Sequence, residues 1–185
     1  MKGRRRKVNS AEDDAVSSTP LTPEEIRART FQRAVKLLSA KSRSIAELRE
    51  RLLEGKRSNT VAVEEVIARL REYGYLDDER FAFGFASLKV RQRPIGRARL
   101  ERDLMFKKVT REVAGEALDL VFAETPEADL IDRAIEKRVR LRGRPKDRTE
   151  AKKLFDHLLR QGFPFELVSE KVRAAMKVDL DDDDP

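Results

Sequence analysis

A helix end and a helix start follow each other within one short segment of the chain, Tyr73-Gly74-Tyr75-Leu76-Asp77-Asp78-Glu79-Arg80-Phe81. Gly74 supplies the left-handed backbone conformation with which helices commonly stop. Asp77 or Asp78 is expected to cap the next helix, since a carboxylate oxygen accepts hydrogen bonds from the free amides of a first turn. Glu79 adds negative charge there, where the helix dipole favours it. The segment therefore predicts a junction between two helical units.

Apolar residues at helical spacing lie on both sides of this junction. The preceding helix is expected to bury Val63, Val66, Ile67 and Leu70. The following helix, over about residues 77–91, is expected to bury a stripe at i, i+4 and i+7 made of Phe81, Phe85 and Leu88. Tyr75 and Leu76 lie in the turn, and we expect both to anchor the two helices against each other.

The same plan returns along the chain. A pair of leucines four residues apart occurs three times, with shifts of 52 and 54 residues, as Leu48/Leu52, Leu100/Leu104 and Leu154/Leu158. Units of three short helices bury little apolar surface alone and gain stability by stacking end to end. The sequence therefore predicts an all-α fold, an elongated array of three tandem three-helix repeats with about nine helices. The expected units are residues 22–76, 77–124 and 125–177, between a charged arm (1–21) and an acidic tail (178–185).

Caps mark several helix starts. Thr22 with Pro23 and Glu25 predicts a capping box, and Ser44 and Thr110 are expected to cap later helices. Thr125, followed by Pro126, is expected to repeat the start seen at Thr22. The first helix is expected to bury Ala28, Phe31, Val35 and Leu38, and the helix after Pro94 and Gly96 to bury Ile95, Leu100 and Leu104.

The composition restricts the functional classes. Charged residues make up 41% of the chain against 39% hydrophobic, and the formal net charge is +7, which favours a polyanionic partner. The absence of Cys excludes disulfides and thiolate metal sites and fits a reducing compartment, so we expect a cytoplasmic protein. No apolar run is long enough for a membrane span, and no apolar segment behind the basic start suggests a secretory signal.

Three segments of the chain resemble one known family. They are Ser44–Leu52 (Ser-Ile-Ala-Glu-Leu-Arg-Glu-Arg-Leu), Gly74–Ala82 (Gly-Tyr-Leu-Asp-Asp-Glu-Arg-Phe-Ala) and Arg91–Leu100 (Arg-Gln-Arg-Pro-Ile-Gly-Arg-Ala-Arg-Leu). Over about residues 30–175 the chain resembles the RecX family, bacterial regulators of the RecA recombinase. The resemblance implies a role in DNA recombination, DNA repair and the SOS response.

No catalytic constellation is predicted. His157 is the one histidine, and on its helix it falls opposite Leu154 and Leu158, so we expect a surface residue. A general base or nucleophile needs partners within hydrogen-bond reach, and no phosphate loop or dinucleotide motif is present. Capping explains the carboxylates at 77–79. We therefore expect no metal, no cofactor and no enzymatic activity.

Positive charge gathers in two stretches. Residues 89–111 hold nine Lys or Arg against two acids, and residues 133–148 hold eight against two. Alternate arginines such as 138, 140 and 142 cannot share one helix face, so either the helix frays near 140 or the charge wraps around its end. The alternative to a binding surface is that both basic stretches are solvated helix faces with local ion pairs. The candidate contact residues are Arg91, Arg93, Arg97, Arg99, Arg102, Lys107, Lys108, Arg140, Arg142, Arg144, Lys152 and Lys153.

The resemblance implies a non-enzymatic regulator that lies along the groove of the RecA–DNA filament and mostly inhibits RecA ATPase, recombinase and coprotease activity. Its expected partners are the RecA filament and, weakly and with strong salt dependence, single- or double-stranded DNA. We expect a monomer with no membrane association. The alternative is a free-standing DNA-binding protein or transcription regulator that uses one helix pair like a helix-turn-helix.

Overall fold

The computed structural model describes residues 21–55 and 58–177, and this part of the chain contains nine helices and no strand. The helices are α1 (Pro23–Ala40), α2 (Ile45–Leu53), α3 (Thr60–Glu72), α4 (Asp78–Gln92), α5 (Arg97–Phe106), α6 (Arg111–Glu124), α7 (Glu127–Arg142), α8 (Arg148–Gln161) and α9 (Phe165–Lys177). The predicted arm, up to residue 20, and the predicted acidic tail lie outside the described residues.

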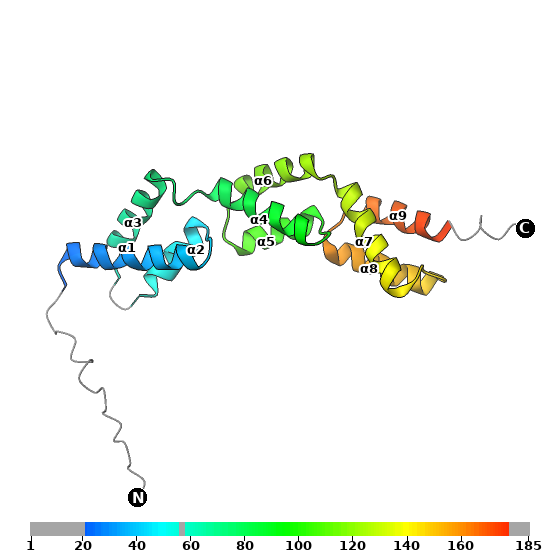
Figure 1. Ribbon diagram of the computed structural model, residues 1–185, viewed down its shortest axis with the longest axis horizontal. Helices are drawn as coiled ribbons and strands as arrows, with labels where there is room; N and C mark the ends of the chain where they lie inside the picture. Colours follow the sequence, from blue (N-terminus) through cyan, green and yellow to red (C-terminus); the bar gives the residue numbers. More distant parts are fainter. Residues whose placement is uncertain (1–20, 56–57, 178–185) are drawn as a thin grey trace, which may run out of the picture.

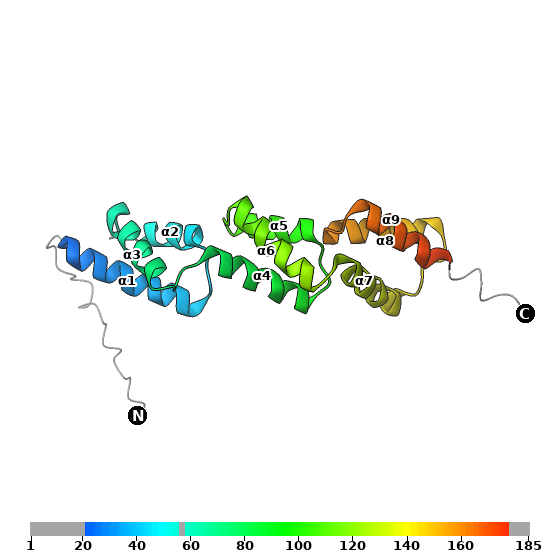
Figure 2. The ribbon, with the colours of Figure 1, turned by 90° about the horizontal axis from the view of Figure 1, so that it is seen from above.

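The helices form three groups that follow one another in a line, so the molecule is elongated (Figure 1). Each group has three helices, and α1, α4 and α7 succeed one another along one long side of the array (Figure 2). The predicted all-α array of three three-helix repeats is confirmed. We propose that the units run over residues 22–76, 77–124 and 125–177.

Local capping explains where most helices begin. Thr22 and Glu25 form the predicted capping box at α1, and Ser44 and Thr110 cap α2 and α6 as predicted. The prediction for Thr125 is wrong. This residue closes α6, and α7 begins after Pro126 without a side-chain cap, because the preceding helix runs directly into the junction.

The junction that ends α3 has the predicted geometry. Gly74 has a φ of +70°, and the amide of Tyr75 donates to the carbonyl of Leu70 at 2.8 Å. Asp77 caps α4 through the amide of Arg80 at 2.9 Å. Leu76 is buried, whereas Tyr75 is 69% exposed, so the expectation that Tyr75 anchors the helices is wrong. The left-handed Gly74 reverses the chain so that only one of these side chains meets the core.

The three leucine pairs that defined the repeat are all buried, as predicted. The predicted faces of two helices are rotated, however. In α4 Leu88 is exposed, Phe81 and Phe85 are half-buried, and the core face holds Ala82, Ala86 and Val90. In α1 Ala28 and Val35 are exposed, Phe31 and Leu38 are half-buried, and the core face holds Thr30 and Ala34.

Close helix packing explains both rotations. α4 packs mainly on α6, and α1 packs mainly on α3. α4 contributes the small side chains Ala82 and Ala86 to the core that it shares with α6, and α6 contributes Ala114 and Ala117. Small side chains let two helices approach more closely than larger ones allow. Ile95 is buried as predicted but lies in the connection before α5, since that helix begins at Arg97.

Two separate cores result from this packing. One contains the buried residues between Ala34 and Leu76, which all belong to the first group of helices. The other runs continuously from Ala82 to Val172 through the second and third groups.

Candidate binding surface

The first and second groups of helices meet at a polar joint, which we call the first joint. Ser44 is fully buried there, and its hydroxyl donates to the carbonyl oxygen of Lys107 at 2.5 Å. The amide of Ile45, at the start of α2, donates to the Asp78 carboxylate at 2.9 Å. Ion pairs of Lys107 with Glu47 and of Lys108 with Glu50, at 3.5 Å and 2.5 Å, complete the joint. The predicted contact residues Lys107 and Lys108 therefore pair with acidic residues of the first group, and the Lys108 side chain is exposed.

The second and third groups meet at a second joint. The amide of Arg97, at the start of α5, donates to the Glu127 carboxylate at 2.7 Å. The amide of Gly96 donates to the carbonyl of Gln161 at 3.0 Å. A side chain at Gly96 would place its Cβ 2.3 Å from the carbonyl carbon of Gly162, so the two backbones cross in contact. Glycine at this position permits the approach.

The two joints repeat one arrangement. In each joint, the backbone amide that begins the second helix of one unit donates a hydrogen bond to an acidic side chain. That side chain belongs to the first residue of the first helix of the next unit. Burial raises the pKa of Asp78 and of Glu127, and the amide hydrogen bonds only partly oppose that effect. These carboxylates were not among the sequence-predicted site residues. The signal in the sequence is an acid at the start of α4 and of α7.

Arg97 and Arg99 of the predicted surface also make internal contacts. The Arg97 guanidinium pairs with Asp119 of α6 at 2.7 Å and donates to the carbonyl of Gly115. Arg99 donates to the carbonyl of Arg160 and to the side chain of Gln161 across the second joint, at 3.4 Å and 3.3 Å. Both side chains hold the array together.

The remaining predicted cations are directed outward. Arg91 and Arg102 are exposed, and Arg93 is partly exposed. Arg102 bonds only to the carbonyl of Ala98 in its own helix. On α7, α8 and the loop between them, all the predicted cations are exposed, namely Arg140, Arg142, Arg144, Lys152 and Lys153. Within the described chain, no carboxylate lies at ion-pair distance from Arg91, Arg93, Arg140, Arg142, Lys152 or Lys153.

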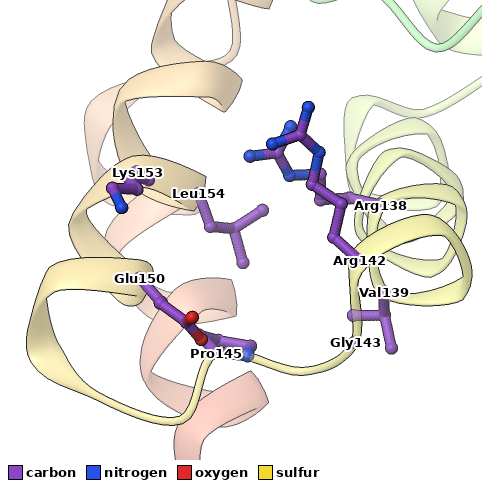
Figure 3. Close-up of a pocket in the computed structure, with 8 residues that line it drawn as sticks. All are labelled: Arg138, Val139, Arg142, Gly143, Pro145, Glu150, Lys153 and Leu154. Atoms are coloured by element: carbon purple, nitrogen blue, oxygen red, sulfur yellow. The ribbon is translucent and has the colours of Figure 1, made fainter.

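The arginines of α7 separate onto two sides of a continuous helix. α7 remains helical up to Arg142, so of the two alternatives posed by the sequence the charge wraps around the helix end. Arg138 and Arg142 lie one turn apart and line a pocket between α7 and α8, which does not include Arg140 (Figure 3). Arg138, which was not among the predicted contact residues, becomes part of a site because of this spacing.

His157 is half-buried, so it is less exposed than the predicted surface residue. Burial lowers the pKa of His157, and the positive charges of Arg138, Arg160 and Arg142 lower it further. His157 lies three residues after Leu154 in α8 and therefore shares its face, so the prediction that it falls opposite Leu154 is wrong. α8 brings the imidazole close to the α7 arginines.

Two other site types find no support in the described residues. Within 21–55 and 58–177, no group of three or more His, Cys, Asp or Glu side chains lies close enough together to hold a metal ion. No helix in the same ranges is both long and apolar enough to cross a membrane.

The fold and this surface define the class, an all-α helical-repeat protein with exposed cations on elements of the second and third units. Residues 77–118 match the family described as RecX, second three-helix domain. The chain is 34% identical over 141 residues to Regulatory protein RecX of Chlorobium limicola, covering 75% of this chain and 84% of that protein. It is 30% identical over 158 residues to Regulatory protein RecX of Pelodictyon phaeoclathratiforme, covering 85% and 94%. The chain belongs to the RecX family.

A solved structure has the same fold. The crystal structure of RecX from Lactobacillus salivarius superposes with a TM-score of 0.72 at 17% sequence identity, over 82% of this chain and 97% of that chain. At this identity the comparison concerns the fold alone.

Proposed function

We propose that this chain is a non-enzymatic regulator that binds the RecA–DNA filament along its groove and mostly inhibits RecA ATPase, recombinase and coprotease activity. Membership of a family whose relatives are named regulatory proteins supports the regulatory role. The observation that supports the filament partner, together with the resemblance, is the line of three similar units with exposed cations on α4 and α7, which follow each other along one long side (Figure 2). A repeating ligand contacts a repeating polymer at several points, and linked contacts add avidity.

The structure narrows the residues proposed for contact. Arg97, Arg99, Lys107 and Lys108 already have partners at the two joints or on α6, so a substitution there would change contacts within the array as well as any contact with a partner. The proposed contact surface therefore consists of the outward cations, which are Arg91, Arg93, Arg102, Arg140, Arg142, Arg144, Lys152 and Lys153.

The test is the ATPase activity of RecA on single-stranded DNA, with and without the purified chain. We expect inhibition that increases with the amount of chain and weakens as salt is raised, because the proposed contacts are charged. An Arg91→Glu/Arg102→Glu variant should inhibit much less while retaining its helical content by circular dichroism. No inhibition by the parent chain at any ratio would refute the proposal.

A matched control comes from α1. Lys36 and Lys41 are exposed cations outside both basic stretches. The Lys36→Glu/Lys41→Glu variant carries the same charge change and should remain closer to the parent in inhibition. Sequence-preferring binding to naked duplex DNA, with RecA activity untouched, would instead support the helix-turn-helix alternative.

A further inference from the structure

A small pocket opens between α7, α8 and the loop that joins them (Figure 3). Its volume is about 260 Å³, below the range of roughly 300–1,000 Å³ typical of sites for drug-sized ligands. It is lined by Arg138, Val139, Arg142, Gly143, Pro145, Glu150, Lys153 and Leu154. The pocket therefore suits a small, charged group.

Two guanidinium groups meet in this pocket. Arg138 and Arg142 lie at i and i+4 on α7 and line the same pocket, and Figure 3 shows both side chains extending from α7 toward α8. Among the described residues, no carboxylate lies at ion-pair distance from either group. Two like charges held together without a counterion repel each other, which favours the binding of an anion between them.

The one carboxylate of the pocket has another role. Glu150 accepts a hydrogen bond from the amide of Lys146 at 2.9 Å and so fixes the loop before α8. Figure 3 shows its oxygens beside Pro145, away from the two guanidinium groups. Glu150 therefore shapes the pocket and does not neutralise Arg138 and Arg142.

The net charge of the residues that line the pocket indicates which kind of anion it would bind. Arg138, Arg142 and Lys153 against Glu150 leave a net charge of +2. A phosphomonoester carries a charge of about −1.5 to −2 at neutral pH, whereas a carboxylate or a phosphodiester carries a single charge. The planar fork of arginine also matches the geometry of phosphate oxygens.

We propose that this pocket is a binding site for a phosphomonoester group, held by Arg138 and Arg142 with Lys153 opposite. The source of the group is either free phosphate or a terminal phosphate of a nucleic acid, which share this chemistry. Arg142 and Lys153 also belong to the proposed contact surface for RecA, but the phosphate site is tested without RecA, so either proposal can fail while the other stands.

The chain contains its own reporter for this site. His157 is the single histidine of the sequence, and it shares a face of α8 with Glu150, Lys153 and Leu154. Burial and the charges of Arg138, Arg160 and Arg142 lower the pKa of His157. A phosphate bound to two of these arginines offsets their effect, so the pKa of His157 should rise on binding.

The experiment is a titration of the His157 imidazole by NMR in the full chain, at constant ionic strength, with sodium chloride exchanged for sodium phosphate. We expect a saturable rise in the pKa of His157 with phosphate and not with chloride. The Arg138→Gln/Arg142→Gln variant should lose this response, and the pKa of His157 in the absence of phosphate should be higher than in the parent.

The matched control uses the neighbouring pair on the same helix. Arg133 and Lys137 are exposed, lie one turn apart on α7 and do not line the pocket. The Arg133→Gln/Lys137→Gln variant removes the same charge and should keep the phosphate response of the parent. Equal loss in both double variants would show a general charge effect and would overturn the proposal.

Short single-stranded oligonucleotides with and without a 5′-phosphate distinguish the sources of the group. A larger response to the phosphorylated strand assigns the site to nucleic-acid ends, and a response to inorganic phosphate alone assigns it to the free ion. The absence of any response beyond that to chloride, in a chain that circular dichroism shows to be helical, would overturn the proposal.

Discussion

The Asp78 carboxylate accepts a hydrogen bond at 2.9 Å from the backbone amide of Ile45, which opens the second helix of the preceding unit. Glu127 does the same for Arg97 at 2.7 Å, one unit further along the chain. Helices leave their first amides without partners inside the helix. The array uses this property to connect successive units, since an acid that begins one unit satisfies an amide of the unit before it.

Removal of either acid should weaken its joint. The Asp78→Ala variant leaves the Ile45 amide without its acceptor, and we expect a loss of about 1–2 kcal/mol in the free energy of unfolding, measured in urea. The Asp78→Asn variant keeps an acceptor oxygen and should lose less. Glu79 is exposed in the same turn, so Glu79→Ala is the control and should cost less than Asp78→Ala. Equal losses in these two alanine variants would contradict the role given to Asp78.

The joint acids should also leave a signature in the pH dependence of stability. Burial raises the pKa of Asp78 and Glu127 in the folded chain, so between the unfolded and folded values the folded state binds more protons. Their contribution to stability therefore falls as pH rises through that window and returns as pH falls.

Urea unfolding of the Asp78→Asn/Glu127→Gln variant at several pH values isolates this contribution. As the pH falls through the raised pKa values of the folded chain toward the ordinary carboxyl values near about 4, the parent should gain stability relative to the variant. Glu25, Glu50 and Glu64, whose pKa is lowered by hydrogen bonds from Thr22, Lys108 and Arg49, act in the opposite direction in both chains. A gap that is constant, or that changes the other way, would refute the assignment.

Ser44 offers a direct probe of the first joint. Its buried hydroxyl accepts from the amide of Glu47 at 3.1 Å and donates to the carbonyl of Lys107 at 2.5 Å. The Ser44→Ala variant removes the cap of α2 and one link between units, so we expect a loss of about 1–3 kcal/mol in urea unfolding. Ser39→Ala, which removes an exposed hydroxyl bonded only within α1, should leave the midpoint nearly unchanged.

Gly96 is the corresponding probe of the second joint. A Cβ at this position would lie 2.3 Å from the carbonyl carbon of Gly162 and 2.4 Å from the amide nitrogen of Phe163, and backbone atoms yield less easily than side chains. Gly96→Ala should therefore lower stability by about 1–3 kcal/mol in thermal unfolding followed by circular dichroism.

The same glycine-to-alanine substitution at Gly84 should have the opposite effect on stability. It lies within α4 with no neighbouring atom within 4 Å of a Cβ. Gly84→Ala should stabilise the chain by about 0.5–1 kcal/mol, because alanine favours the helix. If both alanine variants shifted stability in the same direction, the result would contradict the claim that close backbone contact makes a Cβ at Gly96 unfavourable.

The sequence was sufficient for the features of the fold that depend on neighbouring residues or on a period. The caps at Thr22 and Ser44 and the left-handed Gly74 are each set by interactions over a few residues. The three buried leucine pairs follow from the repeat. These signals fixed the helices and the number of units in the described part of the chain.

The errors have a common physical origin in contacts that are distant along the chain. The faces of α1 and α4 are rotated because small residues allow close packing on α3 and α6, which one helical stripe does not reveal. Charge density alone also marked Arg97 and Lys108 as surface contacts. Their partners, Asp119 and Glu50, lie far away in sequence, so only the folded chain shows that these cations are engaged.

Because the two cores are separate, one joint of the array should deform more easily than the other. The second joint is backed by apolar packing that runs without a break through the second and third units, whereas the core of the first unit ends at Leu76. Hydrogen bonds and ion pairs lie between the two cores at the first joint, and an exposed ion pair such as Lys108–Glu50 stabilises a joint only weakly. When the molecule is bent or pulled along its length, deformation should concentrate between the first and second units, while the other two move as one stiff rod.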